Sequence, residues 1–180
     1  MKEGNREIHA DLIGLCLKGD RNARFQLYHL YAKAMYNICV RMVQNKEDAQ
    51  DILQDSFIAA FENLGAFSGK VSFGAWMKKI VINRSLNFLR KKKPLFTELE
   101  NAGDVPDLNE DNDFVLSPEK IHFAIKELPE GARVVLNLYL LEGYKHKEIA
   151  EMLDISESTS KSQYRRAIFL LQQKLLENEN

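Results

Sequence analysis

Hydrophobic positions recur along this chain at helical spacing. Apolar residues return every three or four positions through most of the sequence, which is the period of an amphipathic helix. Alternating runs of Val, Ile and Thr are missing, as are the Asn-Gly and Asp-Gly pairs typical of β-hairpins. The pattern therefore predicts an all-α protein, with helices over 8–18, 21–44, 46–64, 72–92, 117–128, 130–141, 145–153 and 157–176.

The stretch from Pro94 to Pro118 interrupts this periodicity. It holds three of the four prolines, is acidic, and shows no sustained apolar repeat. Such composition is typical of a tether. We therefore expect two small helical domains, at 8–93 and 117–178, joined by an acidic flexible linker over 94–116.

Composition excludes several classes of protein. The chain has 180 residues and a net charge of −1, and none of its apolar runs approaches the ~20 residues of a membrane-spanning helix. The first residues lack the apolar core of a signal peptide. Cys16 and Cys39 form no Cys-x-x-Cys pair, which argues against a disulfide framework or a zinc site. We expect a cytoplasmic protein that does not insert into a membrane and keeps its thiols reduced.

Charge is segregated along the chain although its sum is near zero. Eight basic residues and no acidic ones lie between Lys70 and Lys93, whereas eight acidic residues and no basic ones lie between Glu98 and Glu119. Segregated charge creates separate local fields. The basic segment is therefore a candidate for contact with nucleic acid.

The helix predicted over 46–64 has an apolar face and an acidic face. Its apolar face gathers Ala49, Leu53, Phe57, Ala60 and Leu64. Its acidic face gathers Asp48, Asp51, Asp55 and Glu62, with Gln54 and Ile58 at the edge. Such a face is either simply solvated or docks onto a basic partner surface. Spacing alone leaves both interpretations open.

The helix predicted over 72–92 carries a stripe of aromatic, amide and cationic side chains. The stripe consists of Trp76, Lys79, Asn83, Asn87 and Arg90, and the loop before the helix adds Phe67 and Lys70. Amides can bond base edges, cations hold phosphates and aromatic rings stack on bases. The stripe is thus a candidate surface for an unstacked base, although Trp76 and Phe67 are equally compatible with a core position.

The carboxy-terminal segment has the pattern of a helix-turn-helix. A short helix with the small Ala150 inside it is followed by a turn, and Ser156 then caps a second helix. The side chains predicted to face outward, or to lie on the flank of that face, are Ser158, Lys161, Ser162, Arg165 and Arg166. Cations and short hydroxyls of this kind suit a major groove.

These segments together resemble the extracytoplasmic-function (ECF) group of the sigma-70 family of bacterial RNA polymerase sigma factors. Residues 48–57 are similar to its core-polymerase-binding motif. Phe67-Ser68-Gly69 and residues 73–90 are similar to its promoter-melting and −10-reading segment. Residues 128–167 are similar to its region four. The resemblance covers roughly 8–93 and 115–177.

The resemblance implies a role for each surface. Asp48, Asp51, Gln54, Asp55 and Ile58 would bind core RNA polymerase. Phe67, Lys70, Trp76, Lys79, Asn83, Asn87 and Arg90 would bind the −10 element. Ser158, Lys161, Ser162, Arg165 and Arg166 would bind the −35 element. Promoter DNA and an anti-sigma factor would be the further partners.

Five positions depart from the family's pattern. Asp154 stands where the turn usually has Gly, and Gly74-Ala75 replaces bulkier polar residues. Ser160 replaces an inward Val or Ile. Gln163 replaces a common Arg, so we expect it to face DNA with one contact fewer.

Two other classes of function are alternatives to this resemblance. A stand-alone helix-turn-helix regulator would share the carboxy-terminal pattern, but the sequence lacks a βα receiver pattern. For an enzyme, His9, His29, His122 and His146 show no metal-ligand spacing, and no Gly-rich phosphate loop is present. We expect no catalytic residues, no metal and no cofactor.

Overall fold

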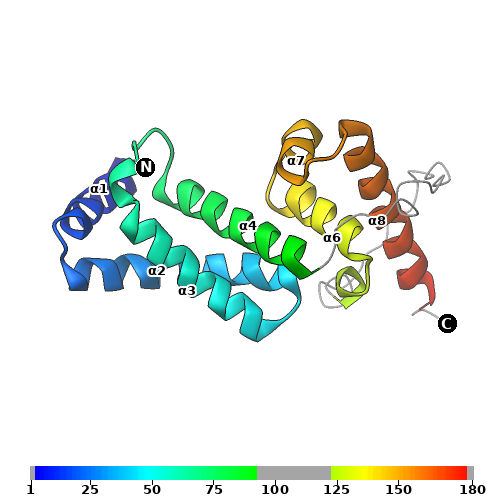
Figure 1. Ribbon diagram of the computed structural model, residues 1–180, viewed down its shortest axis with the longest axis horizontal. Helices are drawn as coiled ribbons and strands as arrows, with labels where there is room; N and C mark the ends of the chain where they lie inside the picture. Colours follow the sequence, from blue (N-terminus) through cyan, green and yellow to red (C-terminus); the bar gives the residue numbers. More distant parts are fainter. Residues whose placement is uncertain (1–2, 93–122, 178–180) are drawn as a thin grey trace. The chain divides into compact units, whose positions relative to one another are not determined.

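The computed structural model describes residues 3–92 and 123–177, with side chains from 9 to 92 and from 123 to 175. All regular structure in these ranges is helical (Figure 1), as the apolar spacing predicted. The expected linker at 94–116 and the start of the helix expected at 117 lie outside the described residues. Residues 123–126 are helical.

The helices follow the predicted order closely. They are α1 (Glu3–Leu17), α2 (Arg21–Val43), α3 (Lys46–Glu62), the 3₁₀ turn η1 (Leu64–Ala66), α4 (Phe73–Lys92), α6 (Glu130–Leu136), the π-helical turn η3 (Asn137–Leu141), α7 (His146–Leu153) and α8 (Glu157–Glu177). The helix expected over 130–141 is thus divided, because its last five residues form the wider π turn, in which the Glu142 N–H donates to the Asn137 carbonyl.

Polar side chains cap the helix starts. Asp20 accepts a hydrogen bond from the Ala23 N–H at 2.9 Å, and Asn45 accepts one from the Asp48 N–H at 2.9 Å. Such bonds satisfy backbone donors that have no partner within the helix. The caps therefore define the residues at which α2 and α3 begin.

Contacts divide the chain into two units, Met1–Phe88 and Leu89–Asn180. In the first unit the apolar faces of α2, α3 and α4 supply the core, which includes Leu27, Met42, Leu53, Phe57, Phe73, Met77 and Val81. Two buried hydroxyls, of Ser56 and Ser85, donate to carbonyls one turn earlier in their own helices. The hydrogen bonds that these buried hydroxyls need are therefore made within their own helices.

The second unit has its own core. Ala124, Ile125, Leu128, Ala132, Leu136, Ala167, Leu171 and Leu175 form one buried cluster between residues 124–136 and α8. Helix α7 also packs on α8. Across the described parts of both units, no helix is long and apolar enough to cross a membrane.

Candidate partner and nucleic-acid surfaces

Helix α3 separates its two faces as the sequence predicted. Ala49, Leu53 and Phe57 are buried, whereas Asp51, Gln54, Asp55 and Ile58 are exposed and Asp48 is half-buried. The Ile58 side chain is 56% exposed beside these polar groups. An exposed apolar side chain next to carboxylates is typical of a surface that a partner covers.

One ion pair on this surface was not apparent from the sequence. Arg84 of α4 places its Nη1 atom 3.9 Å from Oδ2 of Asp55. Both side chains are well exposed, so the pair contributes little to stability. It does bring a cation of the basic helix beside the acidic face of α3, which local spacing within either helix cannot reveal.

The loop between η1 and α4 is anchored by aromatic packing. The ring of Phe67 lies 5.3 Å from that of Trp76 and 5.8 Å from that of Phe73. Phe73 is buried, whereas Phe67 and Trp76 are half-buried. The two candidate stacking residues thus belong partly to the packing of the domain and partly to its surface.

The remaining −10 candidates lie together on the outside of α4. Lys79, Asn83, Asn87 and Arg90 are all exposed, and Lys70 is exposed in the preceding loop. Gly69 in this loop has φ +70°, a conformation that side chains rarely adopt. Helix α4 therefore presents amide and cationic groups along one side. The loop before it contains a turn in which Gly69 has a positive φ.

Gly74 has a packing role at the start of α4. A Cβ atom there would lie 2.9 Å from Cε1 of the Tyr31 ring. Tyr31 packs on Phe73 with ring centres 5.2 Å apart, and its hydroxyl lies 2.7 Å from Nδ1 of His9. The absence of a Cβ atom at position 74 leaves room for the Tyr31 ring at the start of α4.

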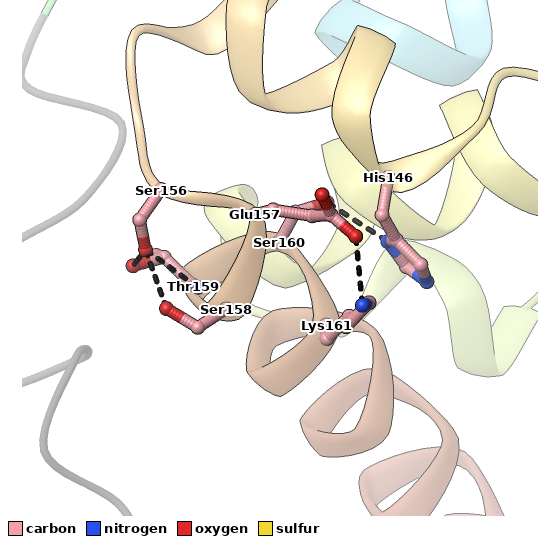
Figure 2. Close-up of polar contacts among 7 residues, drawn as sticks. All are labelled: His146, Ser156, Glu157, Ser158, Thr159, Ser160 and Lys161. Carbon is pink, nitrogen blue, oxygen red and sulfur yellow. Dashed lines mark hydrogen bonds and ion pairs between the residues drawn. The ribbon is translucent and has the colours of Figure 1, made fainter.

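The turn of the helix-turn-helix is formed as the sequence predicted. Asp154 has φ +56° and ends α7 in the left-handed region. Ser156 then accepts a hydrogen bond from the Thr159 N–H at 3.0 Å and contacts the hydroxyls of Ser158 and Thr159 (Figure 2). Asp tolerates the left-handed region better than most residues, so the turn keeps its geometry without Gly.

The outward face of α8 carries most of the predicted −35 candidates. Ser158, Lys161 and Arg165 are exposed, and Ser162 and Arg166 are half-buried. Gln163, in contrast, is 2% exposed, so the expectation that it faces DNA was wrong. Its position belongs to the side of α8 that packs inward, as do Ser160 and Ala167.

His146 was not a predicted site residue, but it joins the two helices of the motif. Its Nδ1 lies 2.9 Å from the buried Ser160 hydroxyl (Figure 2). Its ring stacks on that of Tyr139, with ring centres 4.3 Å apart. Burial, with a further contribution from Lys161, lowers the pKa of His146. The buried hydroxyl of Ser160 thus has a hydrogen-bond partner, His146. A Val or Ile at this inward position would have no polar group to satisfy.

No group of His, Cys, Asp or Glu within 3–92 and 123–177 has the arrangement of a metal site. Cys16 and Cys39 are buried and free. Burial raises the pKa of the Cys39 thiol to about 11. A thiol with so high a pKa carries little nucleophilic thiolate at neutral pH.

Comparison with protein families gives two matches. Residues 27–94 match the family model for sigma-70 region 2, and residues 119–168 match that for sigma-70 region 4. The first match contains α3 and α4, and the second contains the helix-turn-helix.

Full-length relatives show the same similarity. The ECF RNA polymerase sigma factor SigW of Bacillus subtilis is 32% identical over 171 residues, covering 88% of this chain and 91% of the relative. The RNA polymerase sigma-H factor of Pseudomonas aeruginosa is 30% identical over 176 residues, covering 90% and 91%.

Solved structures share the fold. One is the sigma factor RpoE in complex with the anti-sigma factor NepR from Bartonella quintana, with a TM-score of 0.55, 20% identity and coverage of 83% of this chain and 94% of that one. Another is CnrH in complex with the cytosolic domain of CnrY, with a TM-score of 0.55, 22% identity and coverage of 94% and 97%.

Proposed function

The chain belongs to the ECF group of RNA polymerase sigma factors in the sigma-70 family, and from this premise we propose which surface performs each step of initiation. The first unit binds core RNA polymerase through α3. The observation that carries this step is the exposed set Asp51, Gln54, Asp55 and Ile58 on one face of the helix. Carboxylates steer the encounter with a basic partner surface, and Ile58 supplies apolar contact.

The exposed stripe of α4 binds the −10 element in its melted form. Asn83 and Asn87 supply amides for base edges, while Lys70, Lys79 and Arg90 hold phosphates. Phe67 and Trp76 offer ring surface beside them. Capture of an unpaired base offsets a few kcal/mol of unstacking cost, which favours the open promoter.

The outward face of α8 binds the −35 element in the major groove. Lys161, Arg165 and Arg166 are the cations of this face, and Ser158 and Ser162 are its short hydroxyl side chains. The region-two-like domain, 8–93, and the region-four-like domain, 117–178, are joined by the segment 94–116. Two weak contacts in series then give an avidity that neither domain has alone.

Partners and compartment follow from the same mechanism. The factor forms and breaks no covalent bond itself, needs no cofactor, and acts in the cytoplasm on core polymerase and promoter DNA. The two solved neighbours are sigma factors bound to anti-sigma proteins. We therefore assign this chain an anti-sigma partner that competes with core polymerase.

Co-elution with bacterial core RNA polymerase tests the docking step. We expect stoichiometric binding by the wild-type chain and an affinity at least about tenfold lower for Asp51→Lys/Asp55→Lys, since like charges would then face each other. The control is Asp11→Lys/Glu151→Lys, which makes the same change of charge at exposed residues outside α3. Equal loss in both double variants, or in neither, would remove α3 from the proposal.

A further inference from the structure

The outward face of α8 presents an acceptor and a donor side by side. Oε1 of Glu157 lies 2.7 Å from Nζ of Lys161, one turn further along the helix (Figure 2). The two side chains are 48% and 49% exposed. An exposed i,i+4 pair of this kind is weak, so both groups can turn toward an incoming ligand at little cost while they stay side by side.

Glu157 is unusual on a surface proposed to meet DNA. It is the only acidic residue of α8 before Glu177. The hydrogen bond from Lys161 lowers the pKa of Glu157, and so do the charges of Lys161 and Lys147. Glu157 is therefore ionised at neutral pH. An ionised carboxylate facing the phosphates of DNA opposes binding unless it accepts a hydrogen bond from a base.

The hydroxyl groups nearby are largely used within the protein. Ser162 donates to the Thr159 carbonyl at 2.9 Å. Ser156 accepts from the Thr159 N–H and contacts the Ser158 hydroxyl at 2.7 Å. These short side chains let the helix approach a groove closely. They leave base reading to the longer charged side chains of the same face.

The major-groove edge of a C·G base pair has the complementary pattern. Cytosine N4 donates, and a carboxylate is its usual protein acceptor, whereas guanine O6 and N7 accept from Lys or Arg. In a C·G pair the N4 donor and the O6 acceptor are neighbours. A carboxylate and an ammonium held side by side can therefore contact both bases of one pair.

We propose that Glu157 and Lys161 together read one C·G base pair of the −35 element, with Glu157 as a specificity-determining residue. Glu157 accepts from cytosine N4, and Lys161 donates to guanine of the same pair. This inference rests on the proposed binding of the −35 element by α8. It adds Glu157 to the cationic residues that the resemblance assigned to that contact.

The experiment is selection of promoter DNA by reconstituted holoenzyme. Core polymerase with the full chain binds a duplex library randomised across the −35 region, and bound sequences are counted. We expect the wild type to prefer C·G at one position. Glu157→Gln should reduce that preference roughly tenfold and leave the other positions unchanged. Lys161→Gln should relax the same position, because both side chains contact one base pair.

Glu151→Gln is the matched control, since it removes the same charge from an exposed residue of α7. Its selected sequences should equal those of the wild type. Uniformly tighter binding by Glu157→Gln, with unchanged preferences, would show that Glu157 only repels phosphate and would overturn the inference. Absence of any −35 preference in the wild type, or no effect of Arg165→Ala, would instead overturn the proposed function of α8.

Discussion

At the scale of single residues, the packing of the Tyr31 ring explains why position 74 is a glycine. A Cβ atom at position 74 would lie 2.9 Å from the Tyr31 ring, which is itself held against Phe73 and near His9. The resemblance to the family implies a departure at this position but gives no reason for it. The reason is a contact between residues 43 positions apart, and no local pattern encodes such a contact.

The first prediction concerns two glycines in helices. Gly74→Ala should lower the free energy of unfolding by about 1–2 kcal/mol, because the Tyr31 ring must shift in a packed site. Gly14→Ala in α1 should raise it by about 0.5–1 kcal/mol, since a Cβ there meets nothing within 4 Å. Urea unfolding of both variants measures the two effects. Stabilisation by both substitutions would contradict the contact at Tyr31.

The second prediction follows from the buried Cys39 thiol. Burial raises the pKa of this thiol from 9.0 to about 11, although a hydrogen bond with Ser85 opposes the shift. The unfolded chain therefore releases the proton at lower pH than the folded one. The contribution of the protonated Cys39 thiol to the free energy of unfolding is fully present below pH 9. It is lost as the pH rises from about 9 to about 11, at up to ~1.4 kcal/mol per pH unit.

Unfolding free energy measured against pH for wild type and Cys39→Ala separates this effect from other titrations. We expect the variant to be less stable at pH 7, because it loses a buried side chain, but to have the shallower slope above pH 9. Curves that stay parallel between pH 9 and 11 would show that Cys39 does not contribute to the alkaline loss of stability.

At the scale of elements, the sequence was most informative where one helix face decides the outcome. Apolar spacing correctly separated the buried and exposed faces of α3, and it placed the exposed stripe of α4 from Lys79 to Arg90. The expectation drawn from the family resemblance failed at Gln163, which stands in place of a common Arg but is buried. Position on the helix decided that outcome, not residue type.

Contacts between elements account for what the sequence did not predict. The bond between His146 and Ser160 joins α7 to α8, and the pair of Arg84 with Asp55 joins α4 to α3. Each depends on how two helices pack, which periodicity within one helix does not specify. The left-handed Asp154, by contrast, could be anticipated because the turn requires that conformation.

The third prediction addresses the stripe on α4. In holoenzyme, Asn83→Ala should weaken binding of single-stranded non-template −10 DNA by roughly tenfold, since one amide contact to a base edge is lost. Asn37→Ala removes an exposed amide from α2 and should leave binding unchanged. Fluorescence anisotropy with a labelled oligonucleotide measures both. If the Asn83 variant binds as tightly as wild type, the captured base must lie elsewhere.

At the scale of the whole molecule, the chain consists of two units with separate cores. The first unit carries the candidate DNA surface on α4, of which Arg90 alone lies beyond Phe88, and the second unit carries the candidate surface on α8. Neither surface is proposed to hold a promoter alone. In the proposed function, core polymerase would fix the spacing between the two contacts and so convert two weak interactions into one strong interaction.

Duplex promoter binding with and without core polymerase tests whether the two DNA contacts depend on the polymerase. The probe is a labelled fragment chosen by the holoenzyme from the randomised library, at one salt concentration. We predict specific binding by the holoenzyme, at least about hundredfold weaker binding by the chain alone, and no specific binding by core alone. Equal affinity and specificity of the free chain would contradict the account and would indicate a factor that recognises promoters by itself.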